Sequence, residues 1–227
     1  MLDTPEIKNI YKEIQKKLFY MVPEKWDSLY LYASIVEKAY QMPIGEMYFY
    51  YFPKGLLKRD AINVYQIPSK FNIEEQEYMK LVKSLYSSIN SLREEYKKNK
   101  HRLWTNITIS IENFKFKIEY NYDAIDSSES SNYERHIIWR YKYLKEDVET
   151  LNRKERKIIN KYFSEKNDET KKDTEVYEEG LYKRPIHNIM EYNKAESNKN
   201  EKTNVMKEIE ADNVPTNNQI LALFNKK

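Results

Sequence analysis

Two adjacent segments in the middle of the chain alternate apolar and polar residues, and this pattern restricts the possible folds most strongly. Their apolar positions, on either side of a turn near Asn113, are Ile107, Ile109, Ile111, Phe114, Phe116, Ile118, Tyr120 and Tyr122. A period of two is typical of strands with one buried face and one hydrated face. The pattern therefore predicts an antiparallel hairpin whose apolar face packs against another layer.

Three earlier segments also predict strands. From Trp26 onward, Leu29, Leu31, Ala33 and Ile35 alternate with Tyr30, Tyr32 and Ser34. Residues 47–52 are rich in aromatic side chains on both faces, and residues 61–66 predict a shorter strand. The sequence Pro43-Ile44-Gly45 predicts a turn between the first two of these strands.

Helical periodicity surrounds these strands. Thr4 offers an N-cap oxygen for a helix over residues 5–20. Asn72 and Glu75 have the spacing of a capping box, which predicts the start of a long helix that ends near Lys98. The apolar positions of this long helix form one stripe, made of Tyr78, Leu81, Val82, Leu85, Ile89, Leu92 and Tyr96.

Two more helices are predicted after the hairpin. Ser131 and Glu134 repeat the capping-box spacing before a helical face that ends at Leu144, and residues 148–163 predict a further helix. All connections are short. We therefore expect an α+β fold, with an antiparallel sheet of about five strands and with the N-terminal helix, the long central helix and the C-terminal helices packed against it.

The composition changes near residue 164. Residues 1–164 are expected to form the α+β domain, whereas residues 165–227 are rich in Lys, Glu, Asn, Asp and Thr. A segment with so few apolar residues cannot offset its ordering entropy by burial, so we expect most of it to be mobile. Thr216 and Gln219 predict a short helix over residues 216–225, which is either a docking segment or a helix that forms transiently.

The composition also narrows the functional classes. The chain has no cysteine, which excludes disulfides and thiolate metal sites. Its formal net charge of +3 is too small to indicate nucleic-acid binding by itself. Because the N-terminus has no apolar signal-peptide region and no apolar run is long enough to span a bilayer, we expect a cytoplasmic protein without a membrane segment.

Residues that could support catalysis are scarce. The three histidines, His101, His136 and His187, have no metal-ligand partner at helical spacing, and the common phosphate-binding and nucleophile motifs are missing from the sequence. His136 could act with Glu134 as an acid–base pair, but residues two apart on a helix do not face each other. We interpret His136 as an exposed surface histidine, and we expect no enzyme activity, no metal and no cofactor.

A run of carboxylates is followed by an aromatic, basic helix. Between Glu119 and Glu134 no Lys or Arg interrupts the acidic residues. Such a segment is commonly a solvated loop, but it can also steer a basic partner while aromatic neighbours supply the buried contacts. The residues of this candidate contact surface are Glu119, Tyr122, Asp123, Asp126, Glu129, Tyr133, Glu134 and Trp139. Trp139 could instead belong to the core, and for Trp104 we favour the core.

The strand tyrosines have two interpretations. Tyrosine fits a half-buried pleated surface, and aromatic side chains beside lysines can also stack on nucleic-acid bases. Lys115 and Lys117 supply some positive charge, but the acidic run that begins at Glu119 argues against base stacking. We therefore do not expect direct nucleic-acid binding.

Eight short clusters, in order, resemble the YezG-type antitoxin (immunity) family over most of residues 5–145. They are Pro23-Glu24-Lys25-Trp26, Leu29-Tyr30-Leu31-Tyr32-Ala33, Tyr48-Phe49-Tyr50-Tyr51, Ile67-Pro68 with Phe71, Leu92-Arg93 with Glu95, Trp104-Thr105-Asn106, Phe114-Lys115-Phe116-Lys117, and Tyr133-Glu134-Arg135 through Ile138-Trp139 to Tyr141-Lys142-Tyr143-Leu144. The hairpin turn at Glu112-Asn113 departs from the family pattern, in which a glycine is expected.

The resemblance implies a protein that binds and inhibits a cognate nuclease toxin, exported by a type VII secretion system, in the producing cell. Toxin and immunity protein of this family are typically encoded side by side. Two alternatives remain open at this point. One is an export chaperone that binds a secreted protein without blocking its active centre, and the other is a regulator that binds nucleic acid.

Overall fold

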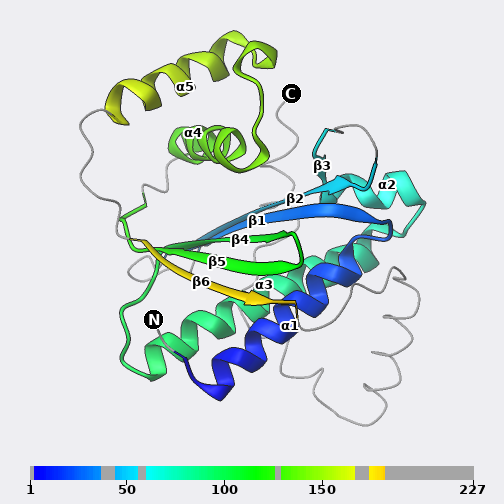
Figure 1. Cartoon of the computed structure of the whole chain (residues 1–227), viewed down its shortest axis with the longest axis vertical. Helices are drawn as coiled ribbons and strands as arrows, with labels where there is room; N and C mark the ends of the chain where they lie inside the picture. Colours follow the sequence, from blue (N-terminus) through cyan, green and yellow to red (C-terminus); the bar gives the residue numbers. More distant parts are fainter. Residues whose placement is uncertain (1–2, 37–43, 56–59, 126–128, 167–173, 182–227) are drawn as a thin grey trace.

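A six-stranded antiparallel sheet forms the middle layer of the molecule. The computed structural model describes residues 3–36, 44–55, 60–125, 129–166 and 174–181. Across the sheet the strand order is β3-β2-β1-β4-β5-β6 (Figure 1). The strands are β1 (Trp26–Val36), β2 (Ile44–Pro53), β3 (Ile62–Asn63), β4 (Asn106–Glu112), β5 (Lys115–Asn121) and β6 (Thr174–Gly180). The predicted α+β class with an antiparallel sheet is confirmed.

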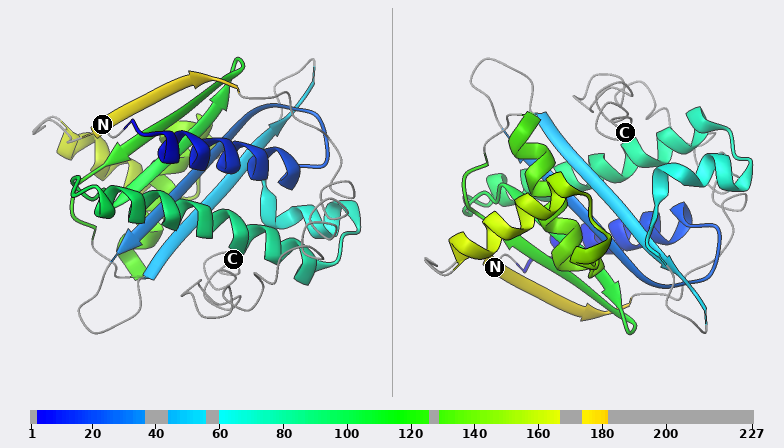
Figure 2. Two further views of the ribbon diagram at one scale, coloured as in Figure 1. Left: turned by 90° about the horizontal axis from the view of Figure 1, so that it is seen from below. Right: turned by 90° about the horizontal axis from the view of Figure 1, so that it is seen from above.

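Helices cover both faces of this sheet. One face is covered by α1 (Pro5–Met21) and α3 (Glu75–Lys98). The other is covered by α4 (Glu129–Trp139), and α5 (Arg153–Lys166) packs on the outer side of α4 (Figures 1 and 2). The connecting segments contain η1 (Val64–Gln66), α2 (Ile67–Phe71), the π-helical η2 (Arg140–Leu144) and η3 (Val148–Thr150).

The larger core lies between the sheet and the α1/α3 layer. It takes the inward positions of the alternating strands, as predicted, including Leu29 and Leu31 of β1 and Ile109 of β4. Trp104, just before β4, has no exposed surface, and the prediction that it belongs to the core is confirmed. Alternation alone therefore identified the faces of β1, β4 and β5 that meet this helical layer.

The predicted helix starts have different outcomes. The Thr4 side chain accepts a hydrogen bond from the Ile7 backbone N–H at 3.3 Å, as expected for the N-cap of α1. The long helix is confirmed, but its N-cap is Glu74, which accepts from the Glu77 N–H at 2.8 Å. Asn72 instead has a left-handed backbone, with φ of 52°, and ends α2. The predicted capping box was wrong because this unpredicted short helix needs a residue that tolerates positive φ.

The helix predicted to be capped by Ser131 begins earlier. Ser131 and Glu134 both lie within α4, whose range starts at Glu129, so this capping box was also wrong. The helix continues through η2 to Leu144, and Lys145 ends it with a left-handed φ of 56°.

The β4–β5 turn forms without glycine. Asn113 and Phe114 have φ values of 50° and 61°, and two consecutive left-handed residues match the twist of a two-residue hairpin. Phe114 is 76% exposed, so its prediction as a buried strand residue was wrong. The turn directs its side chain away from the sheet. The turn predicted at Ile44-Gly45 was also wrong, because both residues belong to β2, while Pro43 lies outside the described residues.

The sheet has one strand more than the predicted number. β6 lies in the segment expected to be mobile, and it pairs with β5 along its whole length. The Tyr177 ring packs on Tyr11 with centroids 4.5 Å apart, and Gln15 donates to Glu179 at 2.8 Å. The domain boundary at residue 164 stays a prediction. The predicted helix at 216–225 lies outside the described residues.

Candidate binding surface

An aromatic layer holds α4 against the second face of the sheet. The rings of Tyr32 and Tyr48 stack with centroids 4.9 Å apart, and Trp139 of α4 packs against both. Trp139 is only 4% exposed, and its indole N–H donates to the Thr108 hydroxyl at 3.1 Å. Trp139, a predicted contact residue, is therefore an internal anchor, and in this conformation it is not available to a partner.

A buried ion pair connects α4 to strand β2. Arg135 of α4 lies 2.9 Å from the Glu46 carboxylate of β2, and the two side chains are 20% and 5% exposed. The Tyr48 hydroxyl also donates to this carboxylate at 2.9 Å. Sequence reasoning missed the pair, although a single carboxylate at the start of an aromatic strand was a visible signal. The pair fixes α4 in one position because a buried charge must keep its partner.

His136 belongs to this interface as well. Its ring stacks on Tyr48 with centroids 4.1 Å apart and lies 3.0 Å from the Tyr50 hydroxyl. The interpretation of His136 as an exposed surface histidine was therefore wrong. Burial, and secondarily the charge of Arg140, lower the pKa of His136 to about 3. A neutral imidazole in this position has a structural role between α4 and β2.

We expect the depressed His136 pKa to make stability depend on pH. As the pH falls below about 6.5, the unfolded chain binds a proton at this ring that the folded chain does not bind, so the free energy of unfolding falls. Replacing His136 with Gln is expected to remove about 1–2 kcal/mol of this loss between pH 6.5 and 4.5. Urea unfolding at pH 6.5 and pH 4.5 measures the free energy of unfolding of the wild-type protein and of the His136→Gln variant. The same pH dependence in both proteins would contradict the prediction.

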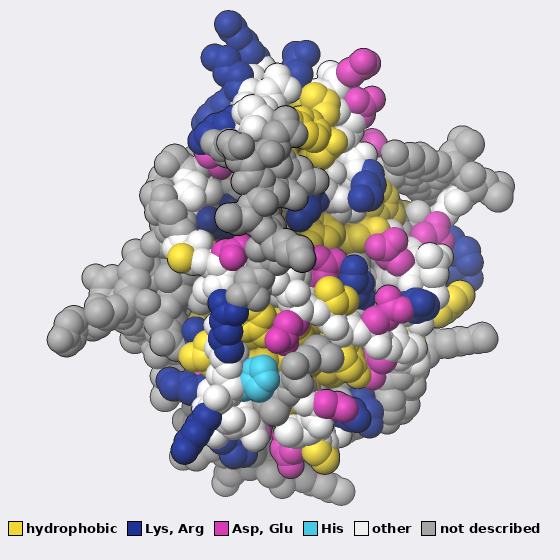
Figure 3. All heavy atoms as spheres, turned by 60° about the vertical axis from the view of Figure 1, so that its left-hand side comes forward, with side chains coloured by type: hydrophobic (Ala, Val, Ile, Leu, Met, Phe, Trp, Pro, Cys, Tyr) yellow, Lys and Arg dark blue, Asp and Glu magenta, His cyan; other side chains and the backbone are white. Residues whose placement is uncertain are grey.

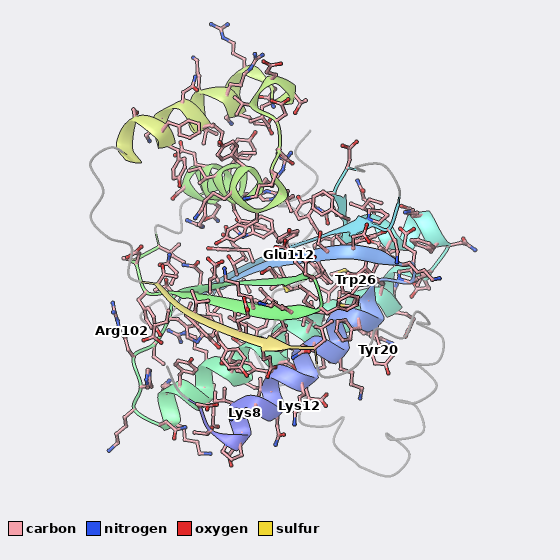
Figure 4. All side chains as sticks on the ribbon, in the orientation of Figure 1. Lys8, Lys12, Tyr20, Trp26, Arg102 and Glu112 are labelled. Atoms are coloured by element: carbon pink, nitrogen blue, oxygen red, sulfur yellow. The ribbon has the colours of Figure 1, made fainter. Side chains whose placement is uncertain are left out.

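The sheet separates Glu119 from Tyr122. Tyr122 is 7% exposed in the α1/α3 core, where its hydroxyl donates to Glu175 at 3.1 Å and burial raises its pKa. Arg102, labelled in Figure 4, lies over its ring at 4.5 Å. On the other face, the Glu119 carboxylate accepts from the Tyr143 hydroxyl at 2.8 Å. These two predicted contact residues therefore do not share a surface.

The remaining candidates lie nearer to solvent. Asp123 is exposed at the end of β5. Tyr133 and Glu134 of α4 both face α5, with the Lys154 ammonium 4.4 Å from the Tyr133 ring and Lys161 3.7 Å from the Glu134 carboxylate. The structure thus brings these two residues together beside cations that were not part of the predicted surface.

The two last candidates cannot be placed. Asp126 and the side chain of Glu129 lie outside the described residues. In the described part of the chain, no cluster of three or more His, Cys, Asp or Glu side chains is arranged to hold a metal ion. None of the described helices combines the length and apolar character that crossing a membrane requires.

Comparison with known proteins identifies the family. The chain matches the family described as "Immunity protein YezG-like" over residues 7–160. It is 35% identical over 144 residues to "Immunity protein YezG" of Bacillus spizizenii (strain ATCC 23059 / NRRL B-14472 / W23), which covers 63% of this chain and 85% of that protein. The protein of the same description from Bacillus subtilis (strain 168) is 30% identical over 139 residues, with 61% and 87% covered.

A third relative comes from another genus. "Type VII secretion system protein EsaG" of Staphylococcus aureus (strain NCTC 8325 / PS 47) is 27% identical over 139 residues, covering 60% of this chain and 80% of that protein. The family match includes both helical layers and strands β1 to β5, whereas β6 lies beyond it. The chain therefore belongs to the YezG-like immunity protein family.

Proposed function

We propose that this protein binds a cognate secreted nuclease toxin in the cytoplasm of the producing cell and holds it inactive until export. The observation that carries the proposal is the family match over residues 7–160. The name of the staphylococcal relative associates that protein with type VII secretion, which supports a secreted target here. The protein acts by binding and not by catalysis.

Part of the toxin contact is acidic. Of the predicted contact residues, Asp123 is exposed, and Tyr133, Glu134 and Glu119 are partly exposed. We propose that Asp123, Tyr133 and Glu134 border the toxin contact together with Asp126 and Glu129. A nuclease binds a polyanion through a basic groove. Carboxylates that face such a groove accelerate association and repel phosphate. Trp139 and Tyr122 contribute indirectly, because they hold α4 and β5 in place.

The proposal predicts stoichiometric inhibition. The probe is the nuclease domain of the cognate toxin, sought as the C-terminal domain of a large secreted protein encoded by a neighbouring gene, and assayed on plasmid DNA and on total RNA. One equivalent of the protein should abolish its nuclease activity. The triple variant Asp123→Lys, Asp126→Lys and Glu129→Lys should weaken binding at least about tenfold at low salt, because three attractive charges become repulsive.

A matched control carries the same change in net charge on another surface. Glu13→Lys, Asp27→Lys and Glu94→Lys replace exposed carboxylates of α1, β1 and α3, and should leave inhibition intact. If calorimetry shows that the Asp123/Asp126/Glu129 variant binds the toxin with unchanged affinity, the proposal that these carboxylates contact the toxin is wrong. Binding of the toxin without inhibition would instead indicate an export chaperone. A gel shift with nucleic acid at two salt concentrations tests the other alternative, a regulator that binds nucleic acid.

A further inference from the structure

The outer face of α5 carries a stripe of positive charge. Its exposed residues recur at helical spacing, so they share one face: Arg153, Arg156, Lys157, Asn160, Lys161 and Ser164. Ile158 and Ile159 lie on the opposite face and are buried against α4. Figure 3 shows Lys and Arg side chains gathered at the top of the molecule, over α5. The stripe from Arg153 to Lys161 is about 12 Å long, from the rise of an α-helix.

Little of this charge is neutralised by neighbours. Glu155, an acidic residue of α5, is turned inward toward Arg140 at 3.4 Å and is 13% exposed. The pair of Lys161 with Glu134 at 3.7 Å is well exposed to water and therefore weak. Within the ranges that the structure describes, neither Arg156 nor Lys157 forms an ion pair. Because these two side chains have no acidic partner among the described residues, they are available to an external anion.

An exposed aromatic ring lies on the same helix. Phe163 is 43% exposed and meets the Tyr141 ring edge-on, with centroids 5.4 Å apart at 84°. Hydrophobic atoms are visible beside the cations in Figure 3. An aromatic side chain bordered by arginine is typical of protein–protein contacts, where the ring supplies buried area and the charges set orientation.

We infer that the α5 stripe and Phe163 bind an acidic surface of the toxin, which extends the contact beyond the carboxylates of α4. This inference rests on the proposed function. The stripe adjoins the α4 residues through Lys161, which lies near Glu134, and Lys154 of the same helix lies over the Tyr133 ring. Because carboxylates border the cations, the surface has a charge pattern suited to a protein, whereas a uniform phosphate backbone would be partly repelled.

Charge reversal tests the stripe. Arg156→Glu with Lys157→Glu changes two exposed side chains that make no ion pair among the described residues, so folding should be unaffected. Against the toxin C-terminal domain in surface plasmon resonance, we expect association to slow about tenfold or more at 50 mM salt and to approach the wild-type rate at 0.5 M salt. Phe163→Ala should instead speed dissociation at both salt concentrations.

The control is Lys25→Glu with Lys54→Glu, the same charge change on two exposed lysines beside the start of β1. It should alter association less than twofold. Equal effects of the two double variants, or no effect of either, would overturn the inference while leaving toxin binding intact. A wild-type protein that does not bind the toxin overturns the proposed function and this inference with it. Tight binding of the wild type to a 20-nucleotide DNA that the Arg156/Lys157 variant loses would assign the stripe to nucleic acid.

Discussion

Replacing Trp104 with alanine is expected to lower the free energy of unfolding by about 3–5 kcal/mol. The side chain has no exposed surface, and its ring lies 6.1 Å from that of Tyr120 on β5. Its backbone carbonyl also accepts from the buried Arg93 guanidinium of α3 at 3.1 Å. Alanine would leave a cavity where α3 meets the sheet, and neighbours anchored in a sheet can collapse into it only partly. Urea unfolding followed by circular dichroism measures the change.

Trp104→Phe separates volume from hydrogen bonding. In the described part of the structure the indole N–H has no hydrogen-bond partner, so phenylalanine removes no bond and loses only part of the ring volume. Its cost should be clearly smaller than that of alanine. A similar cost for the two variants would show that the indole N–H contributes an interaction, and a negligible cost for alanine would contradict the core assignment.

Replacing Arg135 with alanine is expected to destabilise the protein by about 3 kcal/mol. The loss arises because the Glu46 carboxylate, 5% exposed, would keep its charge without the guanidinium that lies 2.9 Å away. The α4 helix should be affected most, since the pair joins it to β2. Hydrogen exchange should therefore become faster in α4 than in α3, where no contact is changed.

A double variant provides the matched test. When Glu46→Met is combined with Arg135→Met, both charges are removed together and the interior becomes apolar, so most of the stability should return. The Tyr48 hydroxyl then still has the Asn132 carbonyl, at 3.3 Å, as an acceptor. A double variant whose loss of stability equals the sum of the losses in the two single Met variants would mean that the coupling energy between Glu46 and Arg135 is zero, and it would contradict the role assigned to the pair.

These variants also bear on function. The accessible residues Tyr133 and Glu134 lie on α4, so a helix released from β2 would no longer present them in a fixed geometry. Arg135→Ala should therefore weaken toxin binding although Arg135 itself is mostly buried. The effect on binding should disappear in the double Met variant if position, and not charge, is what Arg135 supplies.

The fold class is confirmed, whereas the contact residues stay a prediction, and single residues show what the sequence could not decide about their positions. Trp139 was proposed for a partner because aromatic residues beside charge suit an interface, but the same residue type suits a core. Only the position of Trp139 over Thr108 and the tyrosines of β1 and β2 shows that it has the core role and not the interface role. Glu119 and Tyr122 are close in sequence, yet the pleat and the end of β5 place them on opposite faces.

The sixth strand illustrates a second limit. β6 carries Glu175, Tyr177 and Glu179 toward the core side, a pattern with little apolar content. Its carboxylates are satisfied by Tyr122 and Gln15, residues that are distant in sequence. A strand stabilised by such long-range hydrogen bonds has no local hydrophobic signal, so composition alone predicted a mobile segment.

The sequence by itself determined strands β1, β2, β4 and β5, the long helices, and the faces of β1, β4 and β5 that meet α1 and α3. Periodicity carries that information because side chains alternate at two residues per repeat in strands and at 3.6 in helices. The tertiary structure alone decided what covers the second face, where Arg135 and His136 lie, and which charges remain exposed. Those features depend on contacts between residues far apart in the chain, such as Glu46 with Arg135, and local patterns do not encode such pairings.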